Sequence, residues 1–240
     1  MDQQYRLYYL QQLDIQSWCE RVATSNNAAV LASSEMGNHE LQTKILQDGN
    51  DKDFTQSWEK LRAQVAQCTA CSLHQSRTQT VFGVGCRQAD LLIVGEAPGA
   101  NEDRLGEPFV GRAGKLLDAM LATIGLDRSH VYIANVLKCR PPQNRDPLPT
   151  EIAQCTPFLE QQVALLQPKL ILAVGRYAAH YLLETNLALG KLRNQIHTFR
   201  NTNVPLIVSY HPAYLLRSPR DKAKALLDLY QAQQILRRVA

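Results

Sequence analysis

LLIVGEAPG, residues 91–99, joins a short apolar run to a turn that contains a carboxylate between glycines. The run from Leu91 to Val94 is apolar throughout, as expected of a strand that is buried on both faces of a sheet. The turn that follows places Glu96 just beyond the end of this strand. In open α/β sheets, ligands bind outside the carboxyl ends of the strands. Glu96 is therefore a candidate catalytic residue at the mouth of a sheet.

Short apolar runs and helical patterns alternate on both sides of this strand. Strands are predicted near residues 91–95, 131–137, 170–174 and 206–209, and helices near residues 56–67, 113–124, 150–166, 176–183 and 221–238. Strands separated by helices are typical of a mostly parallel sheet with helices on both faces. We predict an α/β fold, a three-layer αβα domain. Gly83-Val84-Gly85 lacks the third glycine of a dinucleotide site and is predicted to be a turn.

The chain divides near residue 57. Residues 20–57 are rich in Asn, Ser, Gln, Asp and Gly, a composition that favours a poorly ordered linker. We expect an N-terminal extension and polar linker over residues 1–57 and a catalytic domain over residues 58–240. Within residues 1–20, an apolar cluster is expected to dock on the domain itself. Gln12-Leu13-Asp14-Ile15 resembles a sliding-clamp-binding peptide but lacks its following aromatic residue, so a repair or replication partner is the alternative.

Charge is distributed unevenly between these two parts. Residues 1–57 contain 4 basic and 8 acidic side chains, whereas residues 58–240 contain 22 and 14. A basic domain attracts polyanions, nucleic acid above all, although solvated surfaces are also often basic. No apolar run approaches the roughly 20 residues that span a bilayer, and the first residues do not resemble a secretory signal. We expect no membrane association and a cytoplasmic protein.

Four of the six cysteines are candidates for a metal site. Cys68 and Cys71 form a C-x-x-C pair, whose spacing lets both sulfurs turn toward one centre. Cys139, directly after a predicted strand, and Cys155, in the next helix, are the best placed to complete a set of four. Spacing alone does not distinguish zinc from an iron-sulfur cluster, and a redox-active pair is a further alternative.

Four motifs together identify a family. GEAPGANED at residues 95–103, EPFVGRAGKLLD at 107–118, NVLKCRPPQNR at 135–145 and HPAYLLR at 211–217 occur in one order over residues 58–238. In these motifs and their spacing the chain resembles the family-4 uracil-DNA glycosylases. The resemblance implies the fold of that family and a 4Fe-4S cluster with a structural role. It assigns the cluster to Cys68, Cys71, Cys139 and Cys155.

The resemblance also implies roles for individual residues of the motifs. Catalytic roles fall on Glu96 and His211, substrate binding on Ala97, Glu102, Phe109 and Asn135, and DNA contacts on Leu215, Leu216 and Arg217. Phe109 would stack on a flipped base, although Pro-Phe-Val is also a core pattern. Asn135 would pair with the edge of uracil through its amide, although a strand-end Asn also caps turns. His211 would donate a hydrogen bond to the departing uracil, while Glu96 orients the attacking water.

Two of these roles have explicit alternatives. Glu102 would wall off the C5 position of the base and so exclude the methyl group of thymine, or it would belong with Asp103 to a solvated helix start. One of Leu215 and Leu216 would fill the gap that the flipped nucleotide leaves, while Arg217 contacts phosphate. The sequence does not say which leucine inserts.

These expectations add up to a monomeric enzyme that removes uracil from DNA and leaves an abasic site for base-excision repair. Its partner is uracil-containing DNA. The main alternative is a 4Fe-4S module of the same fold that binds damaged or single-stranded DNA without turnover. A zinc-containing nucleotide hydrolase is a third hypothesis, based only on the α/β pattern and the acidic loop.

Overall fold

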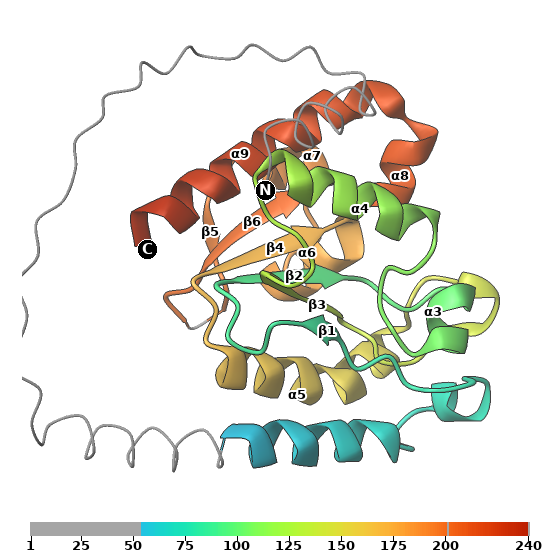
Figure 1. The fold of residues 1–240 in the computed structure, drawn as a ribbon. Helices are drawn as coiled ribbons and strands as arrows, with labels where there is room; N and C mark the ends of the chain where they lie inside the picture. The colour runs from blue at the N-terminus through green and yellow to red at the C-terminus, as the bar shows by residue number, and fades with distance from the viewer. Residues whose placement is uncertain (1–53, 201, 240) are drawn as a thin grey trace, which may run out of the picture.

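A six-stranded sheet forms the middle of the molecule (Figure 1). The computed structural model describes residues 54–200 and 202–239. The strands are β1 (Val84–Gly85), β2 (Leu91–Gly95), β3 (Val131–Asn135), β4 (Leu170–Val174), β5 (His197–Thr198) and β6 (Pro205–Ser209), in the spatial order β1-β3-β2-β4-β6-β5. The four longer strands pair in parallel, and β1 and β5 pair antiparallel at the two edges. The mostly parallel sheet is confirmed.

Helices connect the strands and cover the sheet. They are η1 (Ser72–Gln75), α3 (Ala100–Leu105), α4 (Arg112–Thr123), η2 (Pro142–Asn144), α5 (Pro149–Leu166), α6 (Arg176–Leu183), α7 (Leu189–Leu192), α8 (Pro212–Arg217), η3 (Pro219–Asp221) and α9 (Lys222–Val239). Residues 54–66 are also helical. Within the described ranges, no helix has both the length and the apolar character needed to cross a bilayer.

The sheet has a hydrophobic core on each face. Successive side chains of a strand point to opposite faces, and in β2 Leu92 and Val94 join one cluster whereas Leu91 and Ile93 join the other. The first cluster includes side chains from helical residues 54–66, α5 and α6, and the second includes side chains from α4, α8 and α9. Figure 1 shows these helix layers on opposite sides of the sheet. The predicted three-layer αβα arrangement is confirmed.

The sequence-based prediction differs from the structure mainly at the sheet edges. Gly83-Val84-Gly85 was expected to be a turn, which is wrong: Val84–Gly85 is strand β1, paired with β3. A side chain at Gly85 would place its Cβ 2.0 Å from the carbonyl oxygen of Val131, so the close pairing requires glycine. Strand β5 was not predicted. Two residues are too few for an alternating pattern to register in a sequence.

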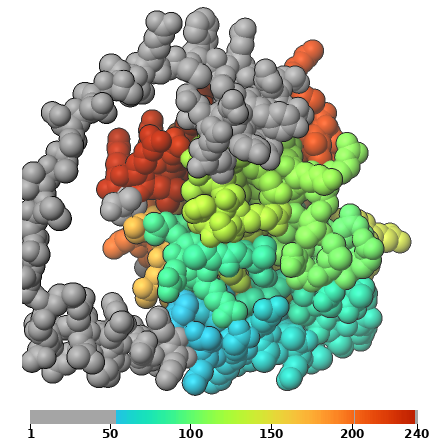
Figure 2. Space-filling model, in the orientation of Figure 1, coloured from blue at the N-terminus to red at the C-terminus, as the bar shows by residue number. Residues whose placement is uncertain are grey.

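The helix over residues 54–66 belongs to the domain. Trp58 is completely buried, and its ring lies 6.2 Å from that of Phe54 and 5.1 Å from that of Tyr132 on β3. In Figure 2 this blue helix lies directly against the segment that follows it. The domain therefore already includes Phe54, slightly before the expected boundary at residue 58. The expectations for residues 1–53 lie outside the described residues.

Candidate active site and cysteine pocket

The carboxyl ends of β2, β3 and β6 bring the predicted site residues together. Gly95 and Asn135 are paired in register as the last residues of β2 and β3, and Glu96 follows Gly95 directly. His211 follows β6 and begins α8. Asn135 is 2% exposed, and its side-chain amide has no hydrogen-bond partner within residues 54–200 and 202–239. The amide is therefore available to pair with a ligand that enters the site.

Gly95 leaves space where two of these side chains meet. A Cβ added at residue 95 would lie 2.4 Å from Oδ1 of Asn135 and 2.8 Å from Cζ of Phe109. Both distances are far below van der Waals contact, so this position requires glycine. An amide and an aromatic ring therefore approach each other over bare backbone. Such a place suits a flat, polar ring that stacks on Phe109 and pairs with Asn135.

Phe109 is held in an unusual conformation. Its φ is 55°, in the left-handed region that non-glycine residues rarely adopt. Arg128 donates to the carbonyl oxygens of Pro108, at 3.2 Å, and of Phe109, and it also pairs with Asp118 at 2.7 Å. At Gly114 a Cβ would lie 1.6 Å from the Phe109 carbonyl oxygen. The guanidinium and the absent side chain together stabilise this backbone, which presents the Phe109 ring to the site.

Glu102 holds the same loop from the other side. Its Oε1 accepts hydrogen bonds from the N–H groups of Val110, at 3.0 Å, and Gly111, at 3.1 Å. The carboxylate therefore has a defined structural contact, whereas its expected role against the C5 position of the base stays a prediction. The side chain of Ala97 packs against the cluster that contains Leu73 and Leu137. Its expected contact with the substrate stays a prediction.

His211 has the tautomer and charge of a neutral hydrogen-bond donor. Its Nδ1 accepts from the N–H of Ala213 at 3.1 Å, so the proton of the neutral ring belongs on Nε2. Burial, with a smaller effect of Arg217, lowers the pKa of His211 to about 4, and Glu102 opposes the shift. The ring stacks on Phe109 with 5.5 Å between centroids. Nε2 can thus donate to a ligand at neutral pH.

Glu96 is a carboxyl group that titrates near neutrality. Burial, with a smaller contribution from Asp146, raises its pKa to about 7, and Arg176 opposes the shift. Tyr177 connects these two charged groups, because its hydroxyl donates to Asp146 and accepts from Arg176 at 2.7 Å. The sequence analysis did not single out these three residues. Asp146 follows η2, whereas Arg176 and Tyr177 begin α6, and no motif spacing indicates that these two segments meet near Glu96.

Helix α8 resolves which leucine faces solvent. Leu215 is completely buried in the core cluster that includes α4 side chains, whereas Leu216 is 37% exposed. Arg217 is also exposed. A side chain that enters DNA must be free to leave its own protein surface. Of the three residues expected to contact DNA, Leu216 and Arg217 are therefore free to do so, whereas Leu215 is packed in the core and anchors the helix.

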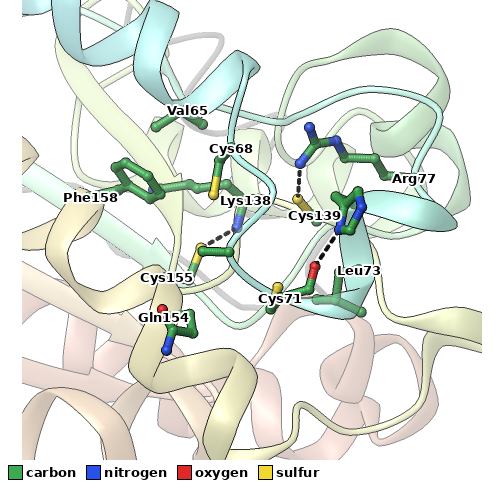
Figure 3. Close-up of a pocket in the computed structure, with 12 residues that line it drawn as sticks. Val65, Cys68, Cys71, Leu73, Arg77, Lys138, Cys139, Gln154, Cys155 and Phe158 are labelled. Atoms are coloured by element: carbon green, nitrogen blue, oxygen red, sulfur yellow. Dashed lines mark hydrogen bonds between the residues drawn. The ribbon is translucent and has the colours of Figure 1, made fainter.

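The four predicted cysteines line one pocket (Figure 3). Cys68 and Cys71 come from the segment before η1, Cys139 follows β3, and Cys155 lies in α5. Figure 3 shows their side chains around a common space. Burial raises the pKa of the Cys139 thiol, and it raises that of Cys155 to about 11. These thiols stay protonated unless a metal displaces the protons.

Two N–H groups point at sulfurs of this pocket. Arg77 Nη1 donates to Cys139 Sγ at 3.1 Å, and the peptide N–H of Lys138 donates to Cys155 Sγ at 3.2 Å. Hydrogen bonds of this kind support thiolate ligands. In the described ranges, no three His, Cys, Asp or Glu side chains form a group that could hold a metal ion. The four sulfurs nevertheless line one pocket.

Comparisons with known proteins show the family of the chain. Residues 82–233 match the family model of the uracil DNA glycosylase superfamily. The chain is 44% identical to the type-4 uracil-DNA glycosylase of Sulfurisphaera tokodaii over 170 residues, which cover 68% of this chain and 77% of the relative.

Two further relatives have the same name. The type-4 uracil-DNA glycosylase of Archaeoglobus fulgidus is 42% identical over 69% of this chain and 86% of its own length. That of Thermotoga maritima is 40% identical over 72% of this chain and 92% of its own length. The family-model match over residues 82–233 includes all six strands and the candidate active-site residues. The chain therefore belongs to the uracil DNA glycosylase superfamily and, within it, to the type-4 uracil-DNA glycosylases.

Proposed function

We propose that the protein hydrolyses the N-glycosidic bond of deoxyuridine in DNA, releases uracil and leaves an abasic site, the first step of base-excision repair. The observation that carries this proposal is the convergence of Asn135, Phe109, His211 and Glu96 at the carboxyl ends of the strands. The type-4 relatives are named for action on uracil in DNA.

Access to the bond requires that the nucleotide leave the duplex. Flipping a base costs a few kcal/mol, and stacking on an aromatic ring returns about 1 to 3 kcal/mol. In our proposal the flipped uracil stacks on Phe109, and the exposed Leu216 enters the gap in the duplex. Arg217 contacts phosphate and, with the excess of basic side chains in residues 58–240, stabilises the complex with DNA.

Asn135 reads the base. Its amide offers both a donor and an acceptor, the pattern complementary to the edge of uracil. Cytosine presents the opposite pattern and would leave buried groups unpaired, which is strongly unfavourable. Thymine differs only by the methyl group at C5, and we propose that Glu102 and the loop it holds occupy that side. Glu102→Ala would then raise activity on thymine relative to uracil.

His211 and Glu96 act on the bond itself. As the bond between the base and C1′ breaks, the electron pair stays with uracil, and the Nε2 proton of His211 stabilises the anion by a hydrogen bond. A neutral ring suffices, in accord with a pKa of about 4. Ionised Glu96 orients a water and favours the positive charge on the sugar. The water oxygen bonds to C1′, and its proton passes to the carboxylate.

The proposal includes a 4Fe-4S cluster held by Cys68, Cys71, Cys139 and Cys155. Four cysteines line this one pocket, and two N–H groups donate to their sulfurs, a donor set that an iron-sulfur cluster accepts. The choice of a cluster over zinc follows the family resemblance. When bound, the cluster supplies a covalent link between the segment before η1, the end of β3 and α5.

Iron and sulfide analysis together with visible absorption tests this cofactor. Protein purified without oxygen should contain about four irons per chain if the assignment is right. Cys155→Ser should lose most of this iron, whereas Cys86→Ser, at a thiol outside the pocket, should keep it. Stoichiometric zinc in the purified protein, with no iron, would contradict the proposal.

Alkaline cleavage of a labelled oligonucleotide that contains one uracil tests the function. Wild type should produce abasic sites, and His211→Ala should lower the single-turnover rate by about 10²- to 10³-fold, the usual effect of losing one such donor. His197→Ala is a matched control, because His197 contacts the carbonyl oxygen of Leu192 at an edge strand. Binding without abasic-site formation by cluster-loaded wild type would favour the DNA-binding module instead.

We also propose that residues 58–240, together with the start of the first helix at Phe54, form the catalytic domain of a monomeric cytoplasmic enzyme. The exposed large apolar side chains of the described residues belong to different segments, as on an ordinary solvated surface. They are Leu105, Leu148, Leu187, Ile196, Leu216 and Leu227. A repair or replication partner for residues 1–20 stays a prediction, which a clamp pulldown with and without those residues would test.

A further inference from the structure

Lys138 is a buried lysine for which the mechanism above has no role. It lies three residues after Asn135 and directly before Cys139, so it separates the base-reading residue from the cysteine pocket. It is 1% exposed. Lysine is almost never fully buried unless its ammonium has partners, because desolvation of the charge is costly. The burial of the Lys138 ammonium therefore needs an explanation in its contacts.

The contacts of Lys138 join three parts of the molecule. Its Nζ donates to the carbonyl oxygen of Asn135 at 2.8 Å and to Oε1 of Gln162 in α5 at 2.6 Å. Gln162 is itself fixed, because its Nε2 donates to the carbonyl oxygen of Phe82 at 2.9 Å. The peptide N–H of Lys138 donates to Cys155 Sγ at 3.2 Å.

The orientation of the Asn135 side chain depends on the position of its own backbone. Its amide makes no hydrogen bond within the part of the chain that the structure describes, so no neighbouring polar group orients it. The Lys138 ammonium holds the carbonyl of the same residue from inside the protein. A shift of that carbonyl would move the amide relative to Phe109 and Gly95, which it closely approaches.

We propose that Lys138 is a positioning residue for uracil recognition: its ammonium fixes Asn135 to α5 and thereby connects the base-reading end of β3 with the four-cysteine pocket. This inference rests on the proposed role of Asn135. A misplacement of about 1 Å in a reacting complex lowers rates by about 100-fold, so the connection is large enough to measure.

A double-mutant cycle tests whether Lys138 acts through Asn135. Lys138→Met keeps the bulk of the side chain and removes the ammonium. In wild type it should lower the single-turnover excision rate by about 10- to 100-fold and weaken inhibition by free uracil in parallel. In the Asn135→Ala background, the same substitution should lower the rate by less than about threefold, because its target is gone.

Structural readouts separate positioning from general destabilisation. Lys138→Met leaves the peptide N–H to Cys155 in place, so iron content should equal that of wild type. Hydrogen exchange in a peptide that covers residues 131–138 should increase. Thr123→Val is the matched control: it removes a buried hydroxyl that donates to Met120 at 2.6 Å, and its effect should combine additively with Asn135→Ala.

Distinct outcomes would overturn the inference and the proposed function. Additive effects of Lys138→Met and Asn135→Ala, in an active wild type, would exclude positioning through Asn135. Loss of iron in Lys138→Met that accounts for the lost rate would also overturn it. If Lys138→Met does not fold, Lys138→Arg is used in the same cycle, since a guanidinium cannot reproduce both contacts. An inactive wild type, in contrast, would mean that the proposed function itself fails.

Discussion

The carboxyl group of Glu96 gives the proposed hydrolysis a distinctive pH dependence. Burial and Asp146 raise its pKa to about 7. If the ionised form orients the water, the reactive fraction rises from about 0.01 at pH 5 to about 0.5 at pH 7, so the single-turnover rate rises about 50-fold. At the ordinary value of 4.5 the same interval would give only about a 1.3-fold rise. His211 has a pKa of about 4, so it stays neutral between pH 5 and pH 7 and adds no second titration to the rate profile.

Two substitutions near Glu96 should move this profile in opposite directions. Asp146→Asn removes a negative charge, so the pKa of Glu96 falls and activity extends to lower pH. Arg176→Met removes a positive charge, so the pKa rises and activity is lost at higher pH than in wild type. Both residues are exposed at the mouth of the site, so neither change should disturb the core.

The assay is single-turnover excision from a uracil oligonucleotide between pH 5 and pH 8, at constant ionic strength and with enzyme in saturating excess. Constant salt matters because surface charges are screened and DNA binding weakens as salt increases. Glu96→Gln is the control: it should be slow and show no rise with pH. A wild-type rate that changes less than about twofold between pH 5 and pH 7 would refute the reasoning, as would shifts of both variants in the same direction.

Three further predictions concern the fit of the site and the stability of the domain. Gly95→Ala should abolish uracil excision while abasic DNA still binds, because its Cβ would lie 2.4 Å from Oδ1 of Asn135; normal turnover would show that the pocket is not where we place it. Leu215→Ala should lower the free energy of unfolding by about 2 to 5 kcal/mol in denaturant titrations, as for other buried leucines, whereas Leu216→Ala should leave stability unchanged and slow excision from duplex more than from single-stranded DNA. The reverse pattern would contradict our assignment of the exposed leucine. Because folding raises the pKa of Glu96, its stabilising protonated form is fully present below about pH 4.5 and is lost as the pH rises through about 7, so Glu96→Gln should raise Tm relative to wild type at pH 8 and have little effect on Tm at pH 4. Equal changes in Tm at both pH values would argue against a buried carboxyl group.

The predictable parts of the fold are the strands and helices whose pattern of apolar residues is long enough to be recognised in the sequence. The apolar runs that became β2 and β4 were predicted with their observed bounds, since each strand is buried along its whole length. The run after Val131 was predicted to extend to Leu137, but β3 ends at Asn135. Side-chain burial continues past that point, and an apolar pattern records burial without recording strand pairing.

In the candidate site, too, residues within local motifs were predictable, whereas residues that matter through contacts between distant segments were not. The motifs were sufficient to select Asn135 and His211, because the family resemblance assigns roles position by position. Arg128, which clamps the Phe109 loop, and Asp146, which faces Glu96, were not selected. Their importance depends on contacts between segments that are distant along the chain. Composition and spacing carry no signal for such contacts.

The fixed conformation of Phe109 has a consequence for the speed of damage search. Because Arg128 and Gly114 stabilise its left-handed backbone before any DNA arrives, the ring needs no rearrangement when a base enters. A repair enzyme meets a vast excess of undamaged base pairs, and each encounter can last only briefly. A preformed Phe109 loop can reject a normal base within the lifetime of a brief encounter. A loop that had to fold around each base would lengthen every encounter with undamaged DNA.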